Sequence, residues 1–157
     1  MRNSNIYADN AATTQLDRTA FNAMTPWLLE EYGNASQSYA FARNPRKALA
    51  TARQIIADCI HALPEEIYFT SGGTESDNWA IKSTAISTTN KKAIITSAFE
   101  HHAVLHTCAT LERQGYPLTY LMPTSEGIIT SEILKQNITN HVSLVSIMFA
   151  NNEIGSI

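Results

Sequence analysis

The segment from Ile67 to Ser76 contains the residues whose types and order most clearly suggest chemistry. A short apolar run ends in the turn Ser71-Gly72-Gly73, and a stretch with helical character follows at once. The first backbone N–H groups of a helix have no partner within the helix and carry partial positive charge, so such a junction can bind a phosphate. The two glycines would let the anion approach without meeting a Cβ, and Thr74 could add a hydroxyl donor. The segment therefore predicts a phosphorylated ligand.

Two familiar phosphate-binding loops do not fit this segment. The nucleoside triphosphate loop requires a Lys followed by Ser or Thr after its second glycine, whereas Thr74 and Glu75 stand there. The dinucleotide fingerprint requires three glycines spaced as G-x-G-x-x-G, and only an adjacent pair is present. A Ser-Gly-Gly turn alone is also typical of an ordinary loop, so the class of ligand must be decided by other residues.

Histidine and cysteine offer little further chemistry at this level. His102 and His106 are four residues apart and could share a helix face, as zinc ligands can. No Glu completes an H-E-x-x-H pattern, so we interpret both as ordinary polar residues and predict no metal site. Cys59 and Cys108 lie in helix-like segments rich in small and apolar residues, and we interpret both as small buried hydrophobic residues rather than a disulfide framework.

The composition narrows the class of protein. The chain has 157 residues, of which 44% are hydrophobic and 16% are charged, and the charged share is below the usual quarter or so. The formal net charge is −3 with no basic stripe, which argues against a nucleic-acid partner. No apolar run is long enough to cross a membrane, and the first residues do not resemble a secretory signal. These features predict a cytoplasmic protein.

Alternating strands and helices would position the phosphate turn. Apolar periodicity, caps and turn residues predict these elements: helices over 15–31, from Pro45 to about Leu63, over 74–87, 102–114 and 131–135, and strands over 67–70, 93–97, 118–122 and 142–149. The alternation from residue 67 onward predicts an α/β fold with a mostly parallel sheet. The last strand has almost no polar alternation, which is typical of a central strand covered on both faces. Because such a strand needs neighbours on both sides, we expect an incomplete three-layer sandwich, with closure by dimerisation as the alternative.

Five short motifs, read in order, give a more specific indication. They are Tyr7-Ala8-Asp9-Asn10-Ala11-Ala12-Thr13-Thr14, Gly33-Asn34, Phe69-Thr70-Ser71-Gly72-Gly73-Thr74-Glu75-Ser76-Asp77-Asn78, Glu100-His101-His102-Ala103-Val104-Leu105 and Val145-Ser146-Ile147-Met148-Phe149-Ala150-Asn151-Asn152-Glu153-Ile154-Gly155. Together they resemble the N-terminal portion of the cysteine desulfurases, pyridoxal-phosphate enzymes of the class V aminotransferase family with fold type I. The resemblance covers nearly the whole chain.

This resemblance implies a function and a domain organisation. It implies conversion of L-cysteine to L-alanine, with the sulfur held as an enzyme persulfide and passed to iron–sulfur scaffold or other acceptor proteins. Residues 1–157 would be part of the large domain of a homodimeric enzyme, with an N-terminal segment at about 1–32 and a partial cofactor-binding domain at about 45–157.

The resemblance also implies roles for individual residues. Gly73 and Thr74 match positions that hold the cofactor phosphate. His101 matches the catalytic histidine that stacks on the pyridine ring and helps to move protons. Asn152 matches the residue near the phenolic oxygen. Both His101 and Asn152 follow predicted strands, and parallel α/β sheets bind ligands at those strand ends. Either residue could instead be a simple cap or turn residue.

Three family residues have no counterpart in this chain. These are the lysine that holds the cofactor covalently, the Asp against the pyridine nitrogen and the mobile sulfur-accepting Cys. The family also usually has a Pro directly after the Gly-Asn pair and a His a few residues on, whereas here Ala35 follows Asn34 and Tyr39 stands near the His position. We therefore expect the chain alone to be inactive. The alternatives are a selenocysteine lyase or another class V enzyme, and a non-catalytic remnant or dimerisation partner.

Overall fold

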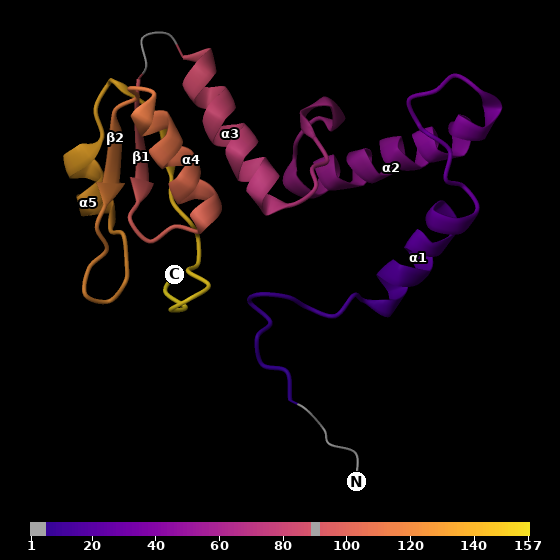
Figure 1. The fold of residues 1–157 in the computed structure, drawn as a ribbon, viewed down its shortest axis with the longest axis horizontal. Helices are drawn as coiled ribbons and strands as arrows, with labels where there is room; N and C mark the ends of the chain where they lie inside the picture. Colours follow the sequence, from indigo (N-terminus) through magenta and orange to yellow (C-terminus); the bar gives the residue numbers. More distant parts are fainter. Residues whose placement is uncertain (1–5, 89–91) are drawn as a thin grey trace. The chain divides into compact units, whose positions relative to one another are not determined.

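The computed structural model describes residues 6–88 and 92–157 of the chain. They form two compact units, with the boundary in the sequence between Phe69 and Thr70. The first unit contains helices α1 and α2, and the second contains the sheet with helices α3, α4 and α5 (Figure 1). Because the phosphate turn, His101 and Asn152 all belong to the second unit, the site can be described within that unit alone.

The second unit is built on a three-stranded parallel sheet. Its strands are β1 (Ala93–Ser97), β2 (Leu118–Leu121) and β3 (Val142–Ser146), in the order β2-β1-β3. Ile95 of β1 is paired with Thr119 on one side and Val145 on the other. Helices α3 (Gly73–Ser87), α4 (His102–Arg113) and α5 (Ser131–Asn137) alternate with the strands. The predicted α/β class with a parallel sheet is therefore confirmed.

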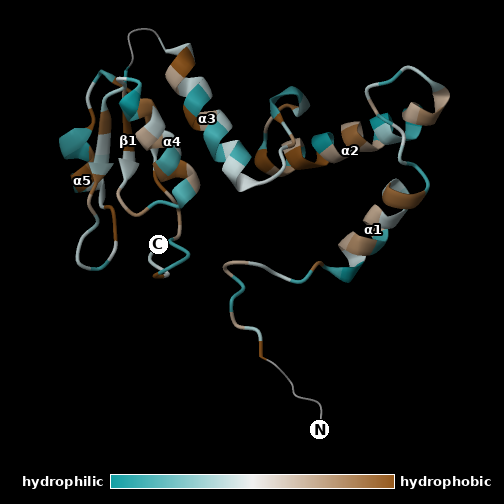
Figure 2. Ribbon diagram, viewed as in Figure 1, coloured by the Kyte–Doolittle hydropathy of each residue, from teal (hydrophilic) through white to brown (hydrophobic). Residues whose placement is uncertain are grey.

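A small apolar core joins helices α3 and α4 to the sheet. Ile94 on β1 is fully buried, as is Cys108 on α4. The rest of this cluster is buried or nearly so and comes from α3 and α4: Ile81, Ala85, Val104 and Leu111. Figure 2 shows these elements with apolar and polar residues interspersed, as expected for helices with one buried side. The core thus fixes how α3 and α4 lie against β1.

The last predicted strand differs from expectation in length and place. β3 ends at Ser146 rather than Phe149, and just beyond its end the amide of Met148 donates to the Glu100 carboxylate and not to a neighbouring strand. β3 is also an edge strand of half-buried residues, whereas β1 is the central strand. The predicted strand over 142–149 is therefore shorter in the structure, and within this chain it lies at the edge of the expected incomplete sandwich.

The predicted strand at 67–70 is not formed among the described residues. The segment runs without helix or strand pairing, and its residues are exposed or half-buried. The Ile67 carbonyl accepts a hydrogen bond from Arg53 Nε at 3.1 Å, and the Arg53 guanidinium lies 5.2 Å from the centre of the Phe69 ring. These contacts to a helix take the place of the strand partner that local propensity required.

The first unit consists of two helices with short 3₁₀ turns. α1 spans Arg18–Leu29, and Asp17 caps it by accepting from the amides of Thr19 and Ala20. Its start at this cap makes it shorter than the predicted 15–31. The turn η1 (Ala40–Ala42) leads directly into α2 (Arg43–Ile60), so this helix begins two residues before Pro45. α2 ends at His61 with a left-handed backbone, φ 55°, and η2 (Pro64–Glu66) follows.

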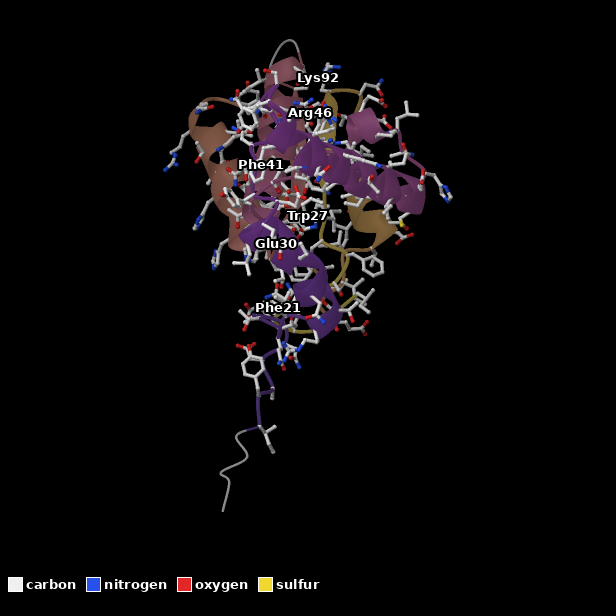
Figure 3. The ribbon with its side chains drawn as sticks, turned by 90° about the vertical axis from the view of Figure 1, so that its right-hand side faces the viewer. Phe21, Trp27, Glu30, Phe41, Arg46 and Lys92 are labelled. Atoms are coloured by element: carbon white, nitrogen blue, oxygen red, sulfur yellow. The ribbon has the colours of Figure 1, made fainter. Side chains whose placement is uncertain are left out.

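Large apolar side chains of the first unit are extensively exposed. Phe21 and Trp27, labelled on α1 in Figure 3, are 43% and 42% exposed. Ile55 and Ile56 on the predicted apolar face of α2 are also exposed. This face has no cover among the described residues of its unit, so Cys59 is exposed too and its predicted burial is wrong. None of the described helices is long and apolar enough to cross a membrane.

The two cysteines should therefore differ sharply in reactivity. Burial, together with the nearby carboxylates of Glu100 and Glu112, raises the pKa of Cys108 to about 11. Since the thiolate is the reactive form, Cys108 stays protonated and inert at pH 8, while the exposed Cys59 reacts. We expect iodoacetamide to add one label per native chain, at Cys59, and two labels in urea. Peptide mass spectrometry measures this, and equal labelling of both native thiols would contradict the burial of Cys108.

Candidate functional site

The start of α3 presents free backbone donors. The helix begins at Gly73, and Gly72 precedes it with extended backbone. The amide of Ser76 donates to the Gly72 carbonyl at 3.2 Å, as the first helical hydrogen bond. Within the described part of the chain, the amides of Gly73, Thr74 and Glu75 have no acceptor. These are the orphan donors that a helix start offers to an anion.

The space beside these donors is open. A Cβ added at either Gly72 or Gly73 would meet no other atom within 4 Å. Intramolecular packing among the described residues therefore does not require glycine at these positions. An open surface above unpaired amides fits the phosphate of the implied cofactor, because a glycine there leaves the anion free to approach the backbone.

Glu75 closes one side of this turn. Its Oε2 accepts from the backbone amide and the hydroxyl of Ser71, both at 2.7 Å. The Ser71 amide, and to a lesser degree its hydroxyl, lowers the pKa of the Glu75 carboxyl, which therefore remains ionised. Since this carboxylate occupies the Ser71 amide, an incoming anion has the amides from Gly73 onward available to it.

His101 lies at the start of the next helix and is held in one orientation. It is the N-cap of α4, and its Nδ1 accepts from the Ala103 amide at 3.1 Å. An Nδ1 that accepts a hydrogen bond places the proton of a neutral imidazole on Nε2. The outer edge of the neutral ring is therefore a hydrogen-bond donor at Nε2.

The structure brings Thr74 and His101 to one hollow. Its volume is about 330 Å³, within the usual range for small-molecule sites. The Asn78 amide links its two walls by donating to the carbonyl of Thr74 at 2.9 Å and that of Ala103 at 3.5 Å. The remaining lining residues come from the same faces of α3 and α4: Lys82, His102, His106, Thr107 and Thr110. Since Thr74 and His101 are at the starts of their helices, the positive ends of both helices border this hollow.

Asn152 is placed differently. Its side chain is exposed, donates to Glu153 Oε1 at 3.3 Å and is not part of the hollow's lining. Gly73 precedes the lining residue Thr74 but is itself not part of the lining. The assignments of Gly73, Thr74, His101 and Asn152 to a cofactor stay predictions, with Thr74 and His101 as the two that share a surface.

Glu100 and Asn151 form a buried polar latch, that is, two buried side chains that hydrogen-bond the segments after β1 and β3. The sequence motifs did not predict this role. The Glu100 carboxylate, 7% exposed, accepts from the Ser97 hydroxyl and the Met148 amide, both at 2.7 Å. Asn151, 5% exposed, donates from Nδ2 to the Phe99 carbonyl at 2.9 Å. The latch joins the segments after β1 and β3, and thus holds His101 near the segment that carries Asn152. The one signal in the sequence that could have indicated it was the carboxylate of Glu100 directly before the candidate residue His101.

Comparison with known proteins decides the family. The class-V aminotransferase family model matches residues 6–157. The chain belongs to the class-V aminotransferase family. The chain is 49% identical to cysteine desulfurase IscS of Methanosarcina thermophila over 99% of its own length. It is 48% identical to cysteine desulfurase IscS of Dictyoglomus turgidum over 97%.

Solved structures agree with this family. A NifS-like protein superposes on this chain with a TM-score of 0.90 at 37% identity, and the superposition covers 95% of the chain. SspA in complex with cysteine superposes with a TM-score of 0.88 at 38% identity. The chain is thus homologous to cysteine desulfurases and corresponds to their N-terminal portion, which confirms the predicted resemblance. It spans 39% of the length of both IscS relatives and 41% of the NifS-like chain.

Proposed function

We propose that this chain forms the phosphate-binding and ring-binding part of a pyridoxal-phosphate-dependent cysteine desulfurase. The observation that supports this most strongly is that Thr74 and His101, which match cofactor positions of the family, line one hollow at two helix starts. Unpaired amides and open space at Gly73 suit a phosphate there. The whole enzyme would convert L-cysteine to L-alanine and transfer the sulfur to an acceptor or iron–sulfur scaffold protein.

In this proposal each residue has a limited task. The amides of Gly73 and Thr74 would hold the phosphate, and His101 would stack on the pyridine ring. Proton transfer by His101 would use Nδ1 once it releases the Ala103 amide, while Nε2–H donates a hydrogen bond. Asn152 approaches the phenolic oxygen, which requires its exposed side chain to exchange Glu153 for the cofactor. Bound pyridoxal phosphate supplies the electron sink on which the chemistry depends. The latch of Glu100 and Asn151 positions the segments that carry these groups.

The substrate and setting belong to the same proposal. SspA, a structural relative at 38% identity, was solved in complex with cysteine, which supports L-cysteine as the substrate. The exposed apolar side chains of α1 and α2 suit burial in a larger, homodimeric enzyme. The predicted cytoplasmic location is also part of the proposal.

A chimera provides the test. Residues 1–157 replace the homologous N-terminal portion of the Methanosarcina thermophila desulfurase, and alanine release from L-cysteine is measured with added pyridoxal phosphate. We expect the chimera to release alanine and to absorb in the visible as a lysine-bound cofactor does. We expect neither signal from the 157-residue chain alone, because no lysine in it matches the family position.

Two results would overturn the proposal. A folded chimera that binds no pyridoxal phosphate would show that this chain does not provide the cofactor contacts. Alanine release by the isolated chain would show that the chemistry needs no further residues. Comparing L-cysteine with L-selenocysteine in the same chimera separates the desulfurase from a selenocysteine lyase.

A further inference from the structure

The α4 side of the hollow carries two histidines that the proposed function does not use. His102 and His106 lie one turn apart on α4, and both side chains are exposed. Their ring centres are 5.2 Å apart with an interplanar angle of 31°. Neither ring has a hydrogen-bond partner among the described residues, so the ring nitrogens are available to a ligand.

In place of the interpretation of His102 and His106 as ordinary polar residues, we propose that they form a two-imidazole site for a late first-row divalent metal ion such as Ni²⁺. Residues at i and i+4 face the same side of a helix. Two imidazoles that each place a nitrogen about 2 Å from one ion have ring centres about 5 Å apart, which matches the observed pair. Imidazole nitrogen suits Ni²⁺, Cu²⁺ and Zn²⁺ and does not suit Mg²⁺.

The surroundings limit the site to these two protein ligands. No group of three or more His, Cys, Asp or Glu in the described residues is arranged around one ion. His101 is further away, with its ring centre 6.4 Å from that of His102, and its Nδ1 already accepts from Ala103. Water would complete the coordination. Lys82 lines the same hollow, and its positive charge weakens cation binding.

The experiment titrates the full 157-residue chain with NiCl₂ by calorimetry, without pyridoxal phosphate. We expect one site in the native chain and no heat with MgCl₂. His102→Asn and His106→Asn should each weaken binding about tenfold or more, since changes even in outer-shell partners cost that much. Lys82→Met should tighten binding about two- to fivefold, the size of a surface charge interaction.

Matched controls make the outcome decisive. His61→Asn, His141→Asn and Cys59→Ser alter exposed candidate ligands outside α4 and should leave the affinity unchanged. Nuclear magnetic resonance should show that Ni²⁺ broadens the His102 and His106 ring signals first. If both α4 variants bound Ni²⁺ as tightly as the unaltered chain, with unchanged circular dichroism, the proposed site would be wrong. Loss of Ni²⁺ binding in any control variant would also contradict it. Because the measurement needs no cofactor, its failure leaves the desulfurase proposal standing, and the reverse also holds.

Discussion

Gly73→Asp should lower the affinity of the chimeric enzyme for pyridoxal phosphate by about 100-fold. A carboxylate here repels the phosphate and can itself accept from the amides that start α3. Losing charge-assisted hydrogen bonds costs about 1.5–3 kcal/mol each, which corresponds to about 10- to 150-fold in affinity. Activity measured against added pyridoxal phosphate reports this affinity. The change should spare the fold, because a Cβ at Gly73 meets nothing within 4 Å.

Gly73→Ala is the matched control for this experiment. It adds the Cβ without the charge, so it separates steric obstruction of the anion from electrostatic competition. Pyridoxal, which lacks the phosphate, gives a second comparison, since its weaker binding should be unaffected by Gly73→Asp. If Gly73→Asp weakened pyridoxal and pyridoxal phosphate equally, the phosphate would not be bound at this turn.

Glu100→Ala should destabilise the second unit by about 3 kcal/mol. The substitution removes an acceptor that is 7% exposed and leaves the Ser97 hydroxyl and the Met148 amide without their partner. A hydrogen bond to a charged group contributes about 1.5–3 kcal/mol, and an unsatisfied buried donor costs about 1–3 kcal/mol. The midpoint and slope of urea unfolding, followed by far-ultraviolet circular dichroism, measure the loss.

Two other substitutions of carboxylate residues test whether the loss of stability in Glu100→Ala comes from the burial of its hydrogen bonds. Glu100→Gln keeps an acceptor oxygen and should cost only about 1 kcal/mol. Glu126→Ala removes an exposed carboxylate from a turn and should change the stability by less than about 0.5 kcal/mol. If Glu100→Ala were no more harmful than Glu126→Ala, the latch would not hold the segments after β1 and β3 together.

Short sequence patterns were sufficient to predict most helices and strands of the second unit. The apolar run at 93–97 and the amphipathic run that stops at Gly115 correspond to β1 and α4 almost residue for residue. Gly115 has φ 86°, a left-handed conformation that glycine adopts without strain, so the helix end is encoded in one residue. The predicted start of α3 also agrees, because Gly72 and Gly73 mark it in the sequence.

Residue order alone thus established the family resemblance, the α/β alternation and a helix start at about Thr74, one residue from the observed start, because each depends on neighbours within a few positions. Tertiary structure was needed to place β1 at the centre of the sheet, end β3 at Ser146 and bury Glu100 against Met148. It also showed that Thr74 and His101 share a hollow. These features depend on contacts between residues tens of positions apart, which local propensity does not encode.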